Sequence, residues 1–475
     1  MNAILPRAAA PTSAQRKVDL HHSLDLCVRD GLFAMPIVTM GLPVNVFLTA
    51  LITKGWVFPK TSIGWLTAMP FLANFLQIFF APFLSRWRPP KTVTVLSATA
   101  NLLCWVGLAG LLGHIPLDRP DLAASWLIAW FFFTSVFSAF AGVSWNAWVQ
   151  EWVPARLRGK YFGRRNRLLQ ISTLTFLLVT GWVLARWNYA IGAFQAVILG
   201  VAVLRVFSIY WQWVSPTRAH RPVLTAALPL AGQIGVLRTS TSLLWFIAFG
   251  AVWSFAANCF GPFYQVFLFE QLHLSAWDVG LLSTVSALGG ALALPAWGRL
   301  LDRFGNRPVM AVSLLVWQGV NLLWCLLTPG SSTIVYVIWA LGGMTSMGAI
   351  ASSGFVLGQF TILLRLIPSE AKSLAIGLNL AITSLAAAVA PIIGGAVLNW
   401  ALGRWTDAIT VYHVCFVVQP IIALAGCVLL FKVHEPQAVP LTEVFGAMRN
   451  IRTLSGVLGL DFLVNYTFYR PNHKR

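Results

Sequence analysis

The chain consists of long apolar runs separated by short polar segments. Twelve such runs can be delimited by charged residues, proline, glycine and asparagine. Each run holds at least the roughly 20 residues that an α-helix needs to cross a bilayer. The sequence therefore predicts an all-α polytopic membrane protein with twelve transmembrane helices. The runs cover approximately residues 31–53, 62–84, 92–113, 123–149, 168–187, 190–213, 243–267, 277–300, 308–328, 333–364, 373–399 and 410–433.

Composition supports this class. Hydrophobic residues make up 58% of the 475 and charged residues only 10%, whereas soluble domains carry roughly 25% charged residues. An ordinary soluble enzyme and a disordered chain are both excluded. The first thirty residues are polar and lack the basic, apolar and small-residue sequence of a cleaved signal peptide.

The net charge of +19 would indicate nucleic acid binding in a soluble protein. If both termini are cytoplasmic, however, 27 of the 33 Lys and Arg residues fall on the inner side, which is the usual bias of membrane proteins. We therefore expect both termini inside, facing an anionic inner leaflet, and no nucleic acid partner. The short loops favour a bacterial inner membrane, and we expect a monomer.

The six cysteines lie in or beside the apolar runs, and none lies in an outer loop. No CxxC or His/Cys ligand spacing occurs. We therefore expect packing roles, with no disulfide framework, metal site or cofactor.

The chain also repeats itself. Residues 153–163 (VPARLRGKYFG) are similar to residues 367–377 (IPSEAKSLAIG), 214 positions later. Two glycine pairs follow nearly the same offset, Gly181 with Gly395 and Gly64 with Gly280. The repeat predicts two homologous six-helix halves.

Five segments follow from the runs and the repeat. The halves are residues 31–213 and 243–433, joined by a central cytoplasmic loop, 214–242. Residues 1–30 form a cytoplasmic N-terminal segment. Residues 434–475 form a basic tail, in which Leu441, Val444, Met448 and Ile451 recur at helical spacing, as in an amphipathic helix lying on a membrane.

The loop after the eighth run reads GRLLDRFGNR, residues 298–307, and resembles the signature loop of the major facilitator superfamily. The resemblance implies two halves that rock around a central site near the bilayer midplane. It also implies that Asp302 faces the start of the fifth helix in a cytoplasmic gate. The gating residues would be Gly298, Asp302, Arg303, Gly305 and Arg307, with Arg158 and Arg164 beside the fifth helix.

The chemistry of this loop fits a gate. Gly298 would permit close backbone approach, Asp302 would face a positive helix N-terminus, and Arg303 and Arg307 would pair with acids or carbonyls. The alternative is a solvated turn that only fixes topology. The matching loop after the second run, SRWRPPKTV, contains no acid, so we expect an asymmetric gate held mainly by Asp302.

Ionisable residues inside a membrane are functional candidates because burying a charge is costly. None of the fourteen acids lies in the middle of a predicted span; the nearest candidates for ion coupling are Asp30 and Glu151. A solvated interfacial role is the favoured alternative for both, and also for Glu270 beside an outer loop. Arg205 is the only basic residue well inside a span. The favoured interpretation is that it snorkels to the headgroups, and the alternative is that it contacts an anionic substrate.

In the family, helices 1, 4, 7 and 10 line the cavity. Polar and aromatic residues on them can bind hydroxyls and flat apolar surfaces, although some would bond to neighbouring helices instead. The proline residues Pro36, Pro43 and Pro262 predict bends, and the string APIIGG (390–395) predicts tight packing of the eleventh helix. The cavity candidates are Asn45, Trp145, Asn146, Trp148, Asn258, Tyr264, Gln265 and Gln359.

The leading functional hypothesis is a secondary transporter of a small neutral or anionic organic solute, because the predicted cavity lacks carboxylates that would bind a cation. The alternative is a non-transporting use of the same scaffold, as an assembly factor or receptor handling a pigment, lipid or protein partner. An enzyme is not expected, because no nucleophile elbow, metal set or phosphate loop appears.

The asymmetric gate can be tested with Asp302→Asn, which removes the charge that would face the helix N-terminus. We expect the variant to populate the inward-open state more and to transport at a changed rate. Distance measurements between spin labels on the two cytoplasmic faces, combined with an uptake assay, check both. An unchanged distribution and rate would show that the loop only fixes topology.

Overall fold

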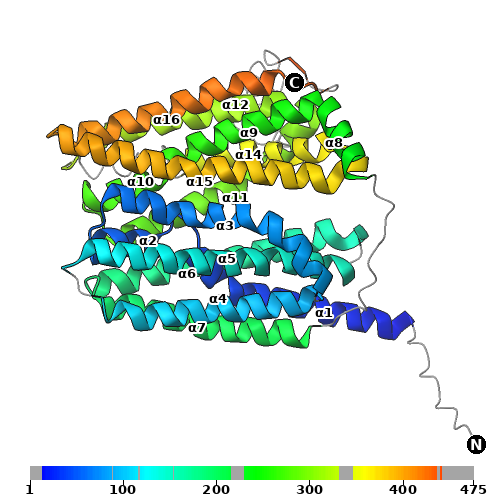
Figure 1. Cartoon of the computed structure of the whole chain (residues 1–475), viewed down its shortest axis with the longest axis horizontal. Helices are drawn as coiled ribbons and strands as arrows, with labels where there is room; N and C mark the ends of the chain where they lie inside the picture. Colours follow the sequence, from blue (N-terminus) through cyan, green and yellow to red (C-terminus); the bar gives the residue numbers. More distant parts are fainter. Residues whose placement is uncertain are drawn as a thin grey trace, which may run out of the picture.

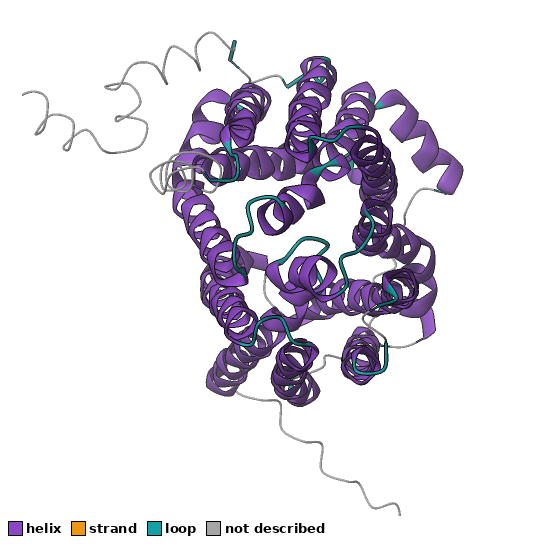
Figure 2. Ribbon diagram, turned by 90° about the vertical axis from the view of Figure 1, so that its left-hand side faces the viewer, coloured by secondary structure: helices purple, strands orange, loops and turns teal. Residues whose placement is uncertain are grey.

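The computed structural model describes residues 13–87, 89–115, 118–152, 155–215, 229–330, 346–435 and 439–440. The described part is helical, and its helices form two groups that lie side by side along a common axis (Figure 1). Figure 2 shows the bundle end-on, with most of the long helices at its perimeter. Eleven described helices are long and apolar enough to cross a membrane. With the first run, which is split in two, they give the expected twelve-helix arrangement.

The first group is formed by the N-terminal half of the chain. Its helices are α1 (Ser13–Met40), α2 (Val46–Ala50), α3 (Lys60–Trp87), α4 (Pro90–Leu112), α5 (Pro120–Trp152), α6 (Ala155–Arg186) and α7 (Ile191–Val214). A π-helical turn, Leu51–Gly55, continues α2.

The second group is formed by the C-terminal half. Its helices are α8 (Leu230–Thr239), α9 (Thr241–Cys259), α10 (Gly261–Glu270), α11 (Ala276–Phe304), α12 (Asn306–Asn321), α14 (Ser346–Leu366), α15 (Lys372–Arg404) and α16 (Ala408–Phe431). A 3₁₀ turn, Leu322–Leu326, extends α12.

Two predicted helices are interrupted, as their prolines indicated. The first run breaks between Met40 and Val46, around Pro43, because proline cannot donate the backbone hydrogen bond that would continue the helix. The seventh run breaks at Phe260, and Pro262 lies in the first turn of α10, where its missing N–H costs nothing. The prediction of one continuous first helix over residues 31–53 was therefore wrong.

Several helices extend beyond the apolar runs. Helix α6 begins at Ala155 rather than near residue 168, and α1 begins at Ser13 inside the segment expected to be polar and non-spanning. Apolar periodicity detects only the hydrocarbon-facing part of a helix, whereas Arg and Lys are good helix formers that extend it into the headgroup region. Helix α8, inside the expected central loop, was not predicted. The expected amphipathic tail and residues 331–345 lie outside the described residues.

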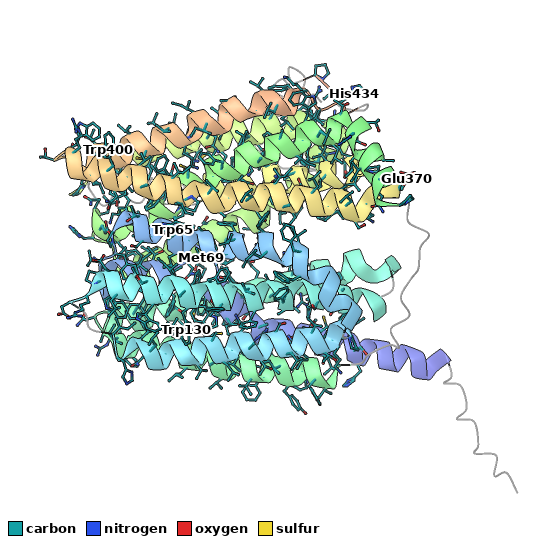
Figure 3. The ribbon with its side chains drawn as sticks, in the orientation of Figure 1. Trp65, Met69, Trp130, Glu370, Trp400 and His434 are labelled. Atoms are coloured by element: carbon teal, nitrogen blue, oxygen red, sulfur yellow. The ribbon has the colours of Figure 1, made fainter. Side chains whose placement is uncertain are left out.

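The two halves approach each other closely at one end of the bundle, which we call the closed end. It is the end where α6 finishes at Arg186, α11 begins at Ala276 and α15 finishes at Arg404; Trp400 marks it in Figure 3. The opposite end, where α3 finishes at Trp87 and α6 begins, carries most of the basic residues that the structure describes and is called the basic end.

Glycines allow this approach. Gly64 of α3 lies against the carbonyl of Pro391 in α15, and a Cβ placed on Gly395 would lie 3.2 Å from the Cα of Gly64. In the second contact, a Cβ on Gly280 of α11 would lie 2.9 Å from the carbonyl oxygen of Leu177 in α6 and 3.7 Å from the Cα of Gly181. The repeat-related glycines thus form two equivalent contacts between the halves, and the packing role predicted for APIIGG is confirmed.

We predict that Gly64→Ala destabilises the protein by about 1–3 kcal/mol, the usual cost of overpacking, because the new Cβ overlaps the backbone carbonyl of Pro391. Thermal unfolding in detergent measures this loss. Gly110→Ala is the matched control, since a Cβ on Gly110 in α4 meets nothing within 4 Å. Equal unfolding temperatures for the two variants would contradict a tight contact at Gly64.

Candidate functional site

Asp30 of α1 is buried, with 3% of its surface exposed. Its Oδ1 accepts hydrogen bonds from Ser208 Oγ at 2.7 Å and Gln212 Nε2 at 2.9 Å. Its Oδ2 accepts one from the indole Nε1 of Trp145 at 3.0 Å. The donors come from α5 and α7, so three helices of the N-terminal half converge on one carboxylate. The favoured interpretation of Asp30 as a solvated interfacial residue was therefore wrong.

Arg205 belongs to the same network. Its side chain is 5% exposed, and Nη1 donates to Ser208 Oγ at 3.0 Å, so the serine hydroxyl bridges the guanidinium to Asp30. Arg205 therefore does not snorkel into the headgroups. Within the described part of the chain, Arg205 Nε and Gln212 Oε1 are buried without a hydrogen-bond partner. The network therefore has one donor and one acceptor that can still form a hydrogen bond.

A second guanidinium, that of Arg165 on α6, lies beside this network. Its Nε donates to the carbonyl of Cys27 at 3.2 Å, and its guanidinium lies 4.5 Å from the ring centroid of Trp145. Gly31 of α1 makes room for it, because a Cβ there would collide with the guanidinium. In the sequence Arg165 belongs to a basic run, and nothing in that pattern distinguishes it from the exposed Arg167.

The other cavity candidates divide into several environments. Gln265 Oε1 accepts a hydrogen bond from Thr49 Oγ1 at 2.9 Å and thereby joins the two halves. Asn45 caps α2, since its Oδ1 accepts from the Leu48 N–H at 2.9 Å and its amide donates to two backbone carbonyls. The polar atoms of Asn45 are therefore used in hydrogen bonds to backbone groups at the helix break around Pro43. The cavity role predicted for Asn45 is wrong.

Aromatic packing accounts for two further candidates. The Tyr264 ring stacks on Phe416 with centroids 4.1 Å apart, and Trp148 is buried in a cluster with Cys27. The Asn258 amide donates to the Ser254 carbonyl at 2.8 Å on its own helix. Asn146 is exposed on α5, and Gln359 is half-buried on α14. Of the cavity candidates, Trp145 joins the network around Asp30.

The signature loop has a defined conformation. Gly305 has φ +90°, a backbone geometry that favours glycine, and this turn starts α12. The buried carboxylate of Glu435 accepts hydrogen bonds from the backbone N–H groups of Asn306 and Arg307 at 3.1 and 2.8 Å, which is a favourable site for a negative charge. Arg307 donates to the Val433 carbonyl at 3.1 Å, as predicted.

The structure does not show the contacts predicted for the other gating residues. Asp302 and Arg303 are exposed, and the Arg303 guanidinium lies 5.4 Å from the ring centroid of Phe304. A Cβ on Gly298 would meet nothing within 4 Å, so the close approach predicted there is wrong. The side chains of Glu151, Arg158 and Arg164 lie outside the described residues. The contact of Asp302 with the start of α6 stays a prediction.

An ion pair joins the halves at the closed end. Lys60 Nζ of α3 lies 2.6 and 2.5 Å from the two carboxylate oxygens of Glu270, at the end of α10. Tyr412 Oη of α16 donates to the same carboxylate at 3.3 Å, and Lys60 is 9% exposed. A solvated role for Glu270 was therefore wrong. The sequence places Lys60 and Glu270 in separate outer segments, and only the fold brings them together.

Comparison with known sequences identifies the family. The sequence model described as Major Facilitator Superfamily matches residues 32–258 and 244–469. The chain belongs to the major facilitator superfamily. It is therefore an integral membrane protein of a family of transporters, as its signature loop indicated.

Curated relatives of this superfamily member match it over part of their length. An MFS-type transporter, pigP, of Monascus ruber is 30% identical over 36% of the chain and 27% of the relative. A homolog of the multi-drug resistance efflux pump PmrA from Lactococcus lactis is 24% identical over 43% of the chain and 49% of the relative. The chain thus matches about a quarter to a half of the length of these relatives.

Solved structures share the fold of this superfamily member over their whole length. A variant of the nucleoside transporter NupG has a TM-score of 0.66 at 14% identity, covering 88% of this chain and 100% of that one. A D-xylose–proton symporter has a TM-score of 0.63 at 12% identity, with 89% and 98% covered. At these identities the likeness concerns the fold alone.

We predict that Asp30→Asn lowers the free energy of unfolding by about 3–5 kcal/mol, because it leaves the buried Arg205 without its compensating charge. Thermal unfolding in detergent measures the loss, and adding Arg205→Gln should recover part of it. The matched control is Asp25→Asn on the same helix, whose ion pair with Arg29 is about half exposed and contributes about 0–1 kcal/mol. Equal losses for the two single variants would rule out a charge-compensated network at Asp30.

Proposed function

We propose that this chain is a secondary transporter that moves a small neutral or anionic organic solute by alternating access. The observation that carries the proposal is the pairing of two features at opposite ends of the bundle. The halves are held together at the closed end by the glycine contacts and by Lys60 with Glu270. A buried charged network lies in the part of the N-terminal half nearer the basic end. Closure at one end is what one state of an alternating-access cycle requires.

We place the closed end outside and the basic end in the cytoplasm. The support is the charge bias of the sequence, in which 27 of the 33 basic residues lie in the segments expected to be cytoplasmic. On this orientation α1 begins and α16 finishes on the cytoplasmic side of the membrane. The gate that opens to the cytoplasm would then involve the signature loop, and the ion pair between Lys60 and Glu270 would be the outer gate.

The substrate class follows from the charges of the network. Asp30 is the carboxylate that would attract a cation, but it already accepts three hydrogen bonds and lies near Arg205. Arg165 adds a second buried guanidinium against the same single carboxylate. A cationic solute would meet an excess of positive charge there, whereas a neutral or anionic solute would not.

Asp30 is also our candidate for ion coupling. A proton bound to its carboxylate would neutralise Asp30 and leave Arg205 buried with an uncompensated charge, which is strongly unfavourable. An anionic solute near Arg205 would restore the balance. Proton uptake and anion binding would therefore favour each other at this network, and its unused polar atoms, Arg205 Nε and Gln212 Oε1, could accommodate the change.

Uptake into proteoliposomes tests the proposal. The purified protein is reconstituted, and uptake of labelled sugars, nucleosides and organic carboxylates is measured with and without a pH gradient. We expect uptake of a neutral or anionic solute, with Asp30→Asn abolishing any stimulation by the gradient. Exclusive uptake of organic cations would overturn the substrate class. No uptake of any solute, together with co-purification of a pigment or protein, would favour the non-transporting alternative.

The outer gate is tested in the same vesicles. Glu270→Gln leaves Lys60 without its carboxylate, so we expect the closed end to open more often and a cysteine placed there to react faster with a membrane-impermeant maleimide. Asp121→Asn is the matched control, because Asp121 is an exposed acid at the same end, in the first turn of α5. Equal labelling rates in the two variants would show that the ion pair between Lys60 and Glu270 does not hold the outer gate closed.

A further inference from the structure

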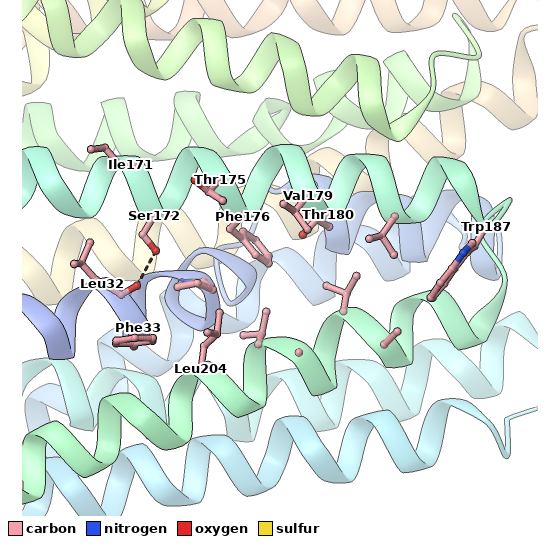
Figure 4. A pocket seen from close by; sticks show the side chains of 16 residues that line it. Leu32, Phe33, Ile171, Ser172, Thr175, Phe176, Val179, Thr180, Trp187 and Leu204 are labelled. Carbon is pink, nitrogen blue, oxygen red and sulfur yellow. Dashed lines mark hydrogen bonds between the residues drawn. The ribbon is translucent and has the colours of Figure 1, made fainter.

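An elongated apolar pocket lies between α1, α6 and α7, apart from the network around Asp30. It measures about 600 Å³, and its walls include Phe33 of α1, Phe176 of α6 and Leu204 of α7. Figure 4 shows side chains from the three helices facing this space, from Leu32 and Ile171 at one end to Trp187 at the other. We call it the α6–α7 groove.

The α6–α7 groove is nearly as long as the hydrocarbon core of a bilayer is thick. It extends from Ile171 of α6 to Trp187, the residue that follows α6, which corresponds to roughly 24 Å at 1.5 Å per residue. The hydrocarbon core of a bilayer is about 30 Å thick. The groove therefore runs along most of one membrane crossing, and a small compact solute would fill only part of it.

The α6–α7 groove is open to the surroundings of the bundle. Ile171 and Val179 of α6 are 60% and 52% exposed. Exposed apolar side chains in the middle of a membrane-spanning helix face lipid tails. A molecule already dissolved in the bilayer can enter the groove sideways, without passing through the transport pathway.

The end of the α6–α7 groove nearer the basic end is bordered by positive charge. Arg167 precedes Ile171 by one turn on α6, and Arg29 precedes Phe33 by one turn on α1. Residues four apart lie on the same helix face, so both arginines continue the faces that line the groove. Arg29 pairs with Asp25 at 2.8 Å, whereas the exposed Arg167 makes no ion pair among the residues that the structure describes.

We propose that the α6–α7 groove binds an acyl chain of an anionic phospholipid from the leaflet at the basic end, with the lipid phosphate at Arg167. An apolar groove between helices with basic residues at the headgroup level is the chemistry that recognises such lipids. The bound chain fills the space between α6 and α7 and braces α6, whose other end carries the Gly181 contact with the second half.

Photocrosslinking tests the site in nanodiscs that contain the full chain. The probe is phosphatidylglycerol with a diazirine in its acyl chain, and phosphatidylcholine with the same chain is the comparison. We expect phosphatidylglycerol to label peptides covering residues 171–187 and 196–204. We also expect Arg167→Gln to weaken labelling by about fivefold, the contribution of one basic residue near an anionic surface. Arg238→Gln, an exposed arginine of α8, should leave labelling unchanged.

A second variant fills the groove itself. Gly200 of α7 lines it, and a Cβ there would meet nothing within 4 Å, so Gly200→Leu places a side chain in the groove without moving the backbone. We expect this variant to lose labelling of residues 171–187 while unfolding at the same temperature as Gly110→Leu, the control at an equally open glycine of α4.

Three results would overturn the proposal. Equal labelling by the two lipids would show that the groove does not select an anionic headgroup. Labelling that is unaffected by Gly200→Leu would show that the lipid binds elsewhere. Loss of labelling when the transported solute is added would make the groove part of the solute pathway. Because the assay needs no transport, its failure is distinguishable from failure of the proposed function.

Discussion

The arrangement of the two halves depends on backbone contacts between glycines at the closed end. Helices in a bilayer gain no hydrophobic energy by leaving lipid, so their association relies on close packing of small residues. Gly64 with Gly395 and Gly181 with Gly280 are the equivalent contacts of the two repeats. A Cβ at Gly395 would also overlap the Lys60 carbonyl. The same contact therefore positions the lysine that pairs with Glu270.

The buried acids of the two halves serve different purposes. In the N-terminal half, Asp30 binds side chains from two other helices and lies within the helix bundle. In the C-terminal half, Glu435 binds the first backbone N–H groups of α12 and so fixes the signature loop at the basic end. The matching loop of the N-terminal half, SRWRPPKTV, contains no acid. The two halves share equivalent glycine contacts between helices, but their buried acids bind different partners.

Sequence patterns found the helices but not their polar partners. Apolar runs predicted the spanning segments that the structure describes, and prolines predicted bends near Pro43 and Pro262, where the structure breaks the helices, because both signals are local. Asp30 was misjudged for a physical reason. The sequence shows that it lies near a run boundary, whereas its burial results from α6 and α7 packing against α1 and from Trp145 of α5, which reaches its carboxylate. The same limitation applies to Arg165, because only the folded structure shows that the missing side chain of Gly31 leaves room for its guanidinium.

The sequence alone determined the class, the number of membrane crossings, the two-half organisation and the superfamily, because hydrophobicity and the signature loop are properties of contiguous residues. The tertiary structure decided which charges are buried together. Lys60 and Glu270 are 210 residues apart, and Asp30 and Ser208 are 178 apart. No local pattern links such residues, since a buried charge is stabilised only by partners that the folded helices bring within hydrogen-bonding distance.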